Sequence, residues 1–410
     1  MKRGELEARL LIFVTLGLVA FGLVMVYSAS SASAAVNGTD PSYYLKRQAT
    51  YAVAGIVLMA LAGRFDYRKL RPLAGSIVLV SLGLLVAVLA IGQSVNGARR
   101  WIGFGPATFQ PSELAKLALA IWAAAWLAKH RPPQTLGELT RPIGALVAVF
   151  AALVLAEPDL GTAIALVLML AGVLLVAGTP VRVLATATGI AGTVGVAVIW
   201  LEPYRRARVF AFLDPWSDPQ HTGFQIIQAM IGMGSGGIFG VGLGNSIQKV
   251  FYLPEAHTDM IFAIIGEELG LVGATALIGA FALFAYAGFR IALRCRDPFG
   301  KRLAVGLTVM VCGQAAINLA AVMGLAPLTG IPLPFVSYGG TSLLVTLASV
   351  GVLLNIAVNE RAGRAALSDR GRGNGRSRAA VARGRGSAAG ARRDRDVRRV
   401  AGSRRGSARS

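Results

Sequence analysis

Apolar residues form long runs, separated by short polar segments, along most of the first 360 residues. A mainly apolar run of about 18 residues or more is long enough to cross the hydrocarbon core of a bilayer as a helix. The pattern therefore predicts an all-α, polytopic membrane protein with about ten transmembrane helices. The predicted spans are 10–30, 49–63, 73–92, 112–128, 142–156, 160–178, 182–201, 260–289, 303–324 and 335–357.

The first apolar run has two interpretations. It follows a charged N-terminal stretch and precedes Ser-Ala-Ser-Ala at 31–34, which is also the layout of a secretory signal peptide. The run is long for a signal peptide, however, and many further spans follow. We therefore expect an uncleaved first span.

Composition agrees with the hydrophobic pattern. Hydrophobic residues make up 55% of the chain and charged residues 15%, whereas soluble domains carry about 25% charged residues. This composition argues against a water-soluble enzyme. The two cysteines, Cys295 and Cys312, match no disulfide framework or metal pattern, so we expect free thiols.

The net charge of +21 is unevenly distributed. Residues 361–410 hold 16 Arg and 3 acids, a balance of +13, while residues 1–360 have a balance of +8. We expect a transmembrane domain over 1–360 and a disordered, Arg-rich cytoplasmic tail over 361–410, because the tail has almost no large apolar residues. The tail either reinforces topology by its charge or binds anionic lipid headgroups, and we expect no nucleic-acid binding.

Basic residues predict the orientation of the spans. With a cytoplasmic N-terminus, the inner connections hold 16 Lys or Arg besides the tail and the outer connections hold 8. Because basic residues accumulate on the cytoplasmic side, both termini are predicted to face the cytoplasm. Most of the other acids and bases then lie on the outer side.

The longest connection, 202–258, is a large outer loop between spans seven and eight in this orientation. A structureless loop of this length is uncommon, so we expect short or re-entrant helices and a functional role. Its glycine-rich run, Gly232–Gly244, lacks the G-x-x-x-x-G-K-[ST] pattern and follows no predicted strand. The glycines are more consistent with tight turns and close helix contacts than with nucleotide binding.

Asp259 stands immediately before the apolar run of the eighth span. A carboxylate against apolar surface loses hydration, which raises its pKa toward the range that suits a general base. The alternative is an N-cap, because Asp before a helix accepts hydrogen bonds from its first amides. For Glu267 and Glu268, further along this span, a structural pairing role is the default expectation.

Other polar groups lie at the outer ends of the predicted spans. Glu113 and Lys116, three residues apart, either pair with each other or line a cavity. Arg100 beside Trp101 either anchors the chain at the interface or binds phosphate. Glu157 and Asp159 flank Pro158, and two prolines and two glycines surround Ser337, so both segments predict broken helices that line protein or a wet cavity.

These features together predict an outer-leaflet site for an amphipathic or anionic lipid-linked ligand, without separating an enzyme from a transporter. At these residues the sequence resembles the SEDS family of peptidoglycan polymerases, over roughly 10–358. Within the family it resembles the FtsW division branch more than the RodA elongation branch, and it departs from the usual aromatic residue at Met260. The matching segments are N-G-A-R-R-W-I (96–102), Q-P-S-E-L-A-K (110–116), E-P-D-L-G-T (157–162), G-L-G-N-S-I-Q-K (242–249), L-P-E-A-H-T-D (253–259), I-G-E-E-L-G (265–270) and S-Y-G-G-T-S (337–342).

The resemblance implies a peptidoglycan glycosyltransferase that polymerises lipid II at the outer face of the cytoplasmic membrane during cell division. It implies Asp259 as the general base, with inversion at the donor sugar and undecaprenyl pyrophosphate leaving. The sequence identifies no cofactor. A divalent cation, Mg²⁺ or Mn²⁺, is a candidate for neutralising the negative charge on the leaving group. The expected substrate-binding residues are Arg100, Trp101, Glu113, Lys116, Asp159, Lys249, His257, Thr258 and Ser337.

The resemblance also implies partners. It implies a class B penicillin-binding protein that crosslinks the new strand, together with other divisome membrane proteins and membrane lipid. A lipid II flippase remains the alternative function. We expect the enzyme because the polar residues lie at the outer end of the spans, and spans one to three offer few polar side chains for a path to the inner leaflet.

Overall fold

The computed structural model describes residues 5–36, 38, 40–95, 98–105, 107–250 and 252–359. Each predicted span overlaps a helix in the described residues, which confirms the all-α fold class. Within the described residues, eight helices are long and apolar enough to cross a membrane, and α2 and α4 fall outside that group, so ten crossings stay a prediction. The long helices are α1 (Glu5–Val36), α2 (Tyr43–Arg64), α3 (Leu70–Ile91), α4 (Pro111–Lys129), α6 (Ala145–Ala156), α7 (Leu160–Ala177), α8 (Val181–Leu201), α11 (Ile261–Arg294), α12 (Pro298–Val322) and Gly340–Asn359.

The tail at 361–410 lies outside the described residues. Its predicted disorder and the predicted domain boundary at 360 therefore stay predictions.

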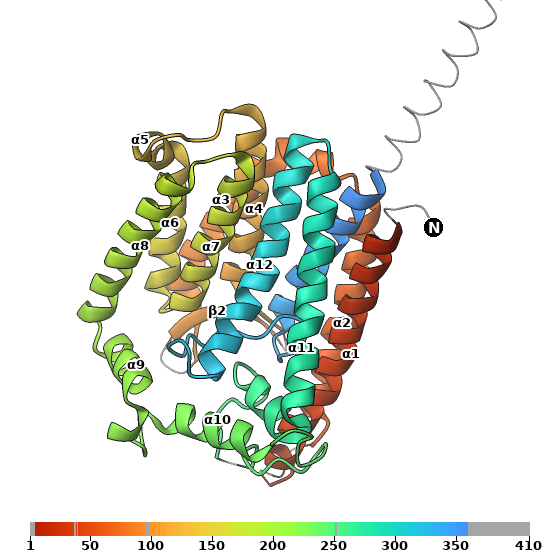
Figure 1. The fold of residues 1–410 in the computed structure, drawn as a ribbon, viewed down its shortest axis with the longest axis vertical. Helices are drawn as coiled ribbons and strands as arrows, with labels where there is room; N and C mark the ends of the chain where they lie inside the picture. The colour runs from red at the N-terminus through yellow and green to blue at the C-terminus, as the bar shows by residue number, and fades with distance from the viewer. Residues whose placement is uncertain are drawn as a thin grey trace, which may run out of the picture. The chain divides into compact units, whose positions relative to one another are not determined.

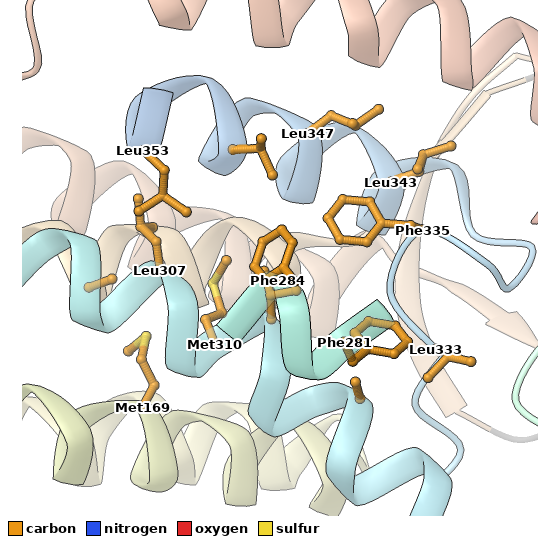
Figure 2. Close-up of a cluster of buried hydrophobic side chains, with 14 of the residues drawn as sticks. Met169, Phe281, Phe284, Leu307, Met310, Leu333, Phe335, Leu343, Leu347 and Leu353 are labelled. Carbon is orange, nitrogen blue, oxygen red and sulfur yellow. The ribbon is translucent and has the colours of Figure 1, made fainter. Parts of the chain in front are cut away.

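Helix α12 is the central helix of the bundle and packs against α4, α7 and α11 (Figure 1). Small residues allow the close approach: a Cβ at Gly288 of α11 would lie 2.2 Å from Thr308 Oγ1 of α12. Figure 2 shows the apolar core beside this contact. Its labelled members are Met169, Phe281, Phe284, Leu307, Met310, Leu333, Phe335, Leu343, Leu347 and Leu353.

The connection between α3 and α4 forms a small sheet that the hydrophobic pattern does not predict. Strands β1 (Gln93–Val95), β2 (Ala98–Phe104) and β3 (Ala107–Phe109) pair antiparallel in the order β1-β2-β3. The strands are short and pair locally, so their sequence carries little of the alternation that identifies longer strands. The sheet fills the connection between α3 and α4 and presents β2 to the site.

The long loop contains two helices, as its length predicts. They are α9 (Pro203–Leu213) and α10 (Phe224–Ser235), and α10 packs on α11. In Figure 1 both lie at the lower end of the bundle, the end opposite the start of α1.

Helix α11 is interrupted at Gly270, where the backbone has φ +63° and ψ −160°. The loop segment 237–242 pairs with the backbone across this break. Val241 and Gly242 donate to the carbonyls of Glu267 and Glu268, and Leu271 and Val272 donate to the carbonyls of Gly237 and Ile238. The groups freed by the break therefore find partners within the protein, as buried backbone requires.

We predict that Gly270→Ala destabilises the protein. Its dihedral angles are essentially restricted to glycine, and forcing another residue into them costs about 1–3 kcal/mol. A Cβ there would also lie 2.4 Å from the nitrogen of Gly240 and 2.5 Å from the carbonyl of Ile238. Thermal unfolding in detergent measures the loss.

Gly279→Ala is the matched control in the same helix, because a Cβ there meets no heavy atom within 4 Å. An equal loss of stability in the two variants would contradict the role given to the break at Gly270.

Candidate functional site

A cavity of about 520 Å³ opens at the end of the bundle that carries the small sheet and the long loop. Its walls come from α2, the sheet, α4, α7, α9, α10 and the segments that precede α11 and the helix Gly340–Asn359. Polar and charged side chains make up much of the lining, including Asp259. A concave site with convergent polar groups and a perturbed acid is the usual setting of a binding or catalytic site.

Asp259 is half-buried, and both its backbone carbonyl and its side chain accept hydrogen bonds. Asn318 of α12 donates from Nδ2 to the Asp259 carbonyl at 2.7 Å and to the Ile331 carbonyl at 2.9 Å. Thr258 donates from Oγ1 to Asp259 Oδ1 at 3.2 Å. Helix α11 begins at Ile261 with Met260 as its N-cap residue, so Asp259 lies one residue too early for the N-cap alternative.

Burial raises the pKa of Asp259 to about 6, while the positive charge of Arg208 opposes this rise. Both side chains flank Gly330, which has a positive φ of +72°. A Cβ at Gly330 would lie 3.8 Å from Asp259 Oδ2 and 3.9 Å from Arg208 Nη1. The geometry gives a carboxylate that is poorly hydrated, able to take up a proton near neutral pH, and close to a cation.

Arg100 reaches the cavity from β2 and is positioned by the turn between α6 and α7. Its Nε donates to the Glu157 carbonyl at 2.9 Å and its Nη2 to the Pro158 carbonyl at 2.5 Å. Trp101, the next residue in β2, also lines the cavity. The guanidinium is therefore held in one orientation by backbone oxygens.

Two acids lie on this same turn. Asp159 lines the cavity and caps α7, accepting from Thr162 N at 2.9 Å and from Thr162 Oγ1 at 2.8 Å. Glu157 is fully buried, and neither of its carboxyl oxygens has a hydrogen-bond partner among the described residues. Burial, reinforced by the charge of Asp159, raises the pKa of Glu157 to about 8. The protonated form of Glu157 is therefore favoured in this buried position.

Glu113 and Lys116 form a buried ion pair on α4, with Oε1 and Nζ 2.8 Å apart. Lys116 also donates to Gln314 of α12. Glu113 lines the cavity, whereas Lys116 lies behind it. Both predicted alternatives, mutual pairing and a place in the cavity wall, therefore apply. The Lys116 ammonium is hydrogen-bonded inside the protein, while the Glu113 carboxylate reaches the cavity wall.

Three further candidates lie outside the cavity lining. Lys249 pairs with Glu268 at 2.8 Å and is buried. His257 packs against Tyr44 with ring centroids 4.3 Å apart, and its carbonyl accepts from Tyr338 N at 2.9 Å. Ser337 Oγ accepts from Leu333 N at 2.8 Å within a buried turn. These contacts support the walls of the cavity from behind.

The cavity thus brings together Asp259, Thr258, Arg100, Trp101, Glu113 and Asp159 of the predicted residues. It adds Arg47, Gln110 and Arg208, which were not among the candidates. The basic run at the start of α9 was visible in the sequence, but the pattern did not indicate which arginine faces the site. In the described part of the chain, no group of three or more His, Cys, Asp or Glu side chains is placed to hold a metal ion.

Residues 8–362 match the family model for FtsW, RodA and SpoVE, described as "Cell cycle protein". The chain belongs to this family. A "Probable peptidoglycan glycosyltransferase FtsW" of Geobacter sulfurreducens is 44% identical over 352 residues, which cover 85% of this chain and 94% of that protein. The expected membership of the SEDS family, with FtsW-type relatives, is therefore confirmed.

Solved structures of family members have the same fold. A structure described as "Structural coordination of polymerization and crosslinking by a peptidoglycan synthase complex" aligns with a TM-score of 0.72 and 34% identity, covering 85% of this chain and 97% of that one. The rod shape determining protein RodA of Thermus thermophilus aligns with a TM-score of 0.64 and 31% identity, covering 85% and 96%. Family membership and the apolar helices make this chain an integral membrane protein.

We predict that Lys249→Met destabilises the protein by about 3–5 kcal/mol, because it leaves the Glu268 carboxylate buried without its cation. The side chains of this pair are 4% and 0% exposed. Thermal unfolding in detergent measures the change.

Lys46→Met is the control, because Lys46 and its partner Asp40 are both largely exposed, and ion pairs at the surface contribute little to stability. If Lys249→Met left stability unchanged, the scaffolding role of the buried pair would be refuted.

Proposed function

We propose that this protein is a peptidoglycan glycosyltransferase that polymerises lipid II into glycan strands at the outer face of the cytoplasmic membrane during cell division. The observation that carries the proposal is the half-buried Asp259 in a cavity that also presents Arg47, Arg100 and Arg208. A general base with a raised pKa and cations for an anionic group are the two requirements of this transfer. Relatives named as FtsW-type glycosyltransferases support the assignment.

In the proposed reaction, the Asp259 carboxylate accepts the proton of the 4-hydroxyl on the acceptor sugar. The acceptor oxygen attacks the anomeric carbon of the donor with inversion, and the bond to undecaprenyl pyrophosphate breaks. The electron pair of that bond leaves with the pyrophosphate, so negative charge grows on the leaving group. Cations already oriented in the cavity stabilise that charge without reorganising.

The residues behind the cavity have supporting roles in this proposal. Lys116 and Lys249 were candidates for contact with the pyrophosphate, but their ammonium groups are held by buried carboxylates. The lining arginines are better placed for that contact. Glu113 and Asp159 shape the polar wall, and Thr258 orients the base through its hydrogen bond to Asp259.

The proposed partners and location follow from the family. A class B penicillin-binding protein would crosslink the strand as it forms, together with other divisome membrane proteins. The related structure described as coordinating polymerization and crosslinking supports such a partner. We propose cytoplasmic termini and a septal location for the same reason.

We predict that Asp259→Asn lowers the rate of polymerisation by about 10²–10⁴-fold, because the amide cannot accept the acceptor proton. The assay uses purified full-length protein with lipid II in detergent, with and without a class B penicillin-binding protein, and measures glycan length on gels.

Asp214→Asn is the matched control, because Asp214 is an exposed acid of the same outer loop that lies outside the cavity lining. Glycan product in detergent, without any vesicle, distinguishes an enzyme from a flippase. Normal polymerisation by the Asp259 variant would defeat the proposal.

The pH dependence gives a second prediction. Because the active carboxylate is the deprotonated form, activity should rise with pH through an apparent pKa near 6 and then level off. Arg208 favours the charged form, so Arg208→Gln should move this acidic limb to higher pH. Rates of lipid II polymerisation between pH 5 and pH 8 test the shift. A limb at an unchanged pH in the variant would contradict the coupling of Arg208 to Asp259.

A further inference from the structure

The outer loop carries an exposed apolar tip that the proposed reaction does not use. We define the loop tip as Ile238, Phe239 and Leu243, whose side chains are 61%, 81% and 56% exposed. The chain has no Asp, Glu, Lys, Arg or His between His221 and Lys249. Exposed apolar side chains in such a charge-free segment are typical of a surface that contacts lipid or another protein.

The loop tip is fixed to α11 rather than loosely attached. Four backbone hydrogen bonds join segment 237–242 to α11 across the break at Gly270. Just beyond the tip, Glu267 accepts from Ser246 Oγ and from Ile247 N, and Lys249 pairs with Glu268. The tip therefore keeps its depth relative to the membrane-spanning part of α11.

The length of α11 indicates how deep the loop tip lies relative to the hydrocarbon core of the membrane. Its other end carries Arg290 and Arg294 on the buried Glu7 of α1, and a charged cluster of this kind belongs outside the hydrocarbon core. No charged residue lies between Glu268 and Arg290. The twenty helical steps from Gly270 to Arg290 measure about 30 Å at 1.5 Å per step, which equals the thickness of the core.

Gly270 therefore lies at the outer boundary of the hydrocarbon, and the loop tip lies beside it. The next residues of α11, Leu271 and Val272, are 59% and 52% exposed. They continue the apolar surface of the tip into the lipid-facing side of the helix. The nearby charges, Lys249 and Glu268, are buried against each other and so are kept away from this surface.

We propose that the loop tip inserts into the outer leaflet of the membrane and anchors the outer loop at the lipid surface. The occupant of the apolar surface is the acyl and headgroup boundary of the bilayer. Through Glu267 and Glu268, this anchor fixes the loop segment that leads to Asp259 at the level where a lipid-linked sugar presents its headgroup. Lipid insertion thus sets the height of the cavity above the membrane.

Site-directed spin labelling tests the proposal on the full chain in phosphatidylethanolamine–phosphatidylglycerol nanodiscs. Cys295 and Cys312 are first replaced by alanine, and single cysteines are introduced by Phe239→Cys or Leu243→Cys. Collision rates with oxygen, which concentrates in lipid, and with a nickel complex, which stays in water, are measured. The ratio of oxygen to nickel collisions should be several-fold higher at both positions than at a water-exposed control.

The controls come from the same chain. Gln220→Cys lies in the exposed part of the outer loop and sets the water value, while Ile278→Cys, on a 40% exposed position of α11, sets the lipid value. A ratio at 239 and 243 as low as at 220 would place the tip in water and overturn the proposal. Protection from both reagents would mean that a protein surface covers the tip, which overturns it equally.

Discussion

The chemistry of the cavity depends on the partial dehydration of one carboxylate that still remains able to ionise. Burial favours the protonated form of Asp259, whereas the proposed role as a general base needs the ionised form. Arg208 beside Gly330 offsets part of the burial. The remaining structure holds these two groups at a fixed separation, since a shift of either would change the balance between hydration and charge.

Buried ion pairs provide much of that rigidity. Glu113–Lys116 lies between α4 and α12, and Lys249–Glu268 joins the outer loop to α11. Such pairs bring little net stability compared with an apolar core, because both ions lose their hydration on folding. Their geometry is directional, however, so they select one arrangement of loop and helix, which an apolar contact of the same size does less well.

Much of this arrangement could be predicted from the sequence. The apolar runs identify the helices because a membrane span must satisfy its own backbone. Asp259 is identified through the resemblance to the SEDS family, because its position alone also fits an N-cap. Arg208 could not be chosen from its neighbours, since its role depends on how α9 is rotated against the segment before the last helix. Lys249 is a residue that the sequence did suggest as a candidate but whose partner it could not identify. Its charge and position suggested a ligand contact, and only the three-dimensional structure pairs it with Glu268.

The side-chain amide of Asn318 joins two segments that are far apart in sequence, because it donates to the carbonyls of both Asp259 and Ile331. Asp259 and the cavity wall at Ile331 are therefore both hydrogen-bonded to the central helix α12. A change in the tilt of α12 would therefore move the backbone at Asp259 and the segment at Ile331 together, with little change in the distance between them.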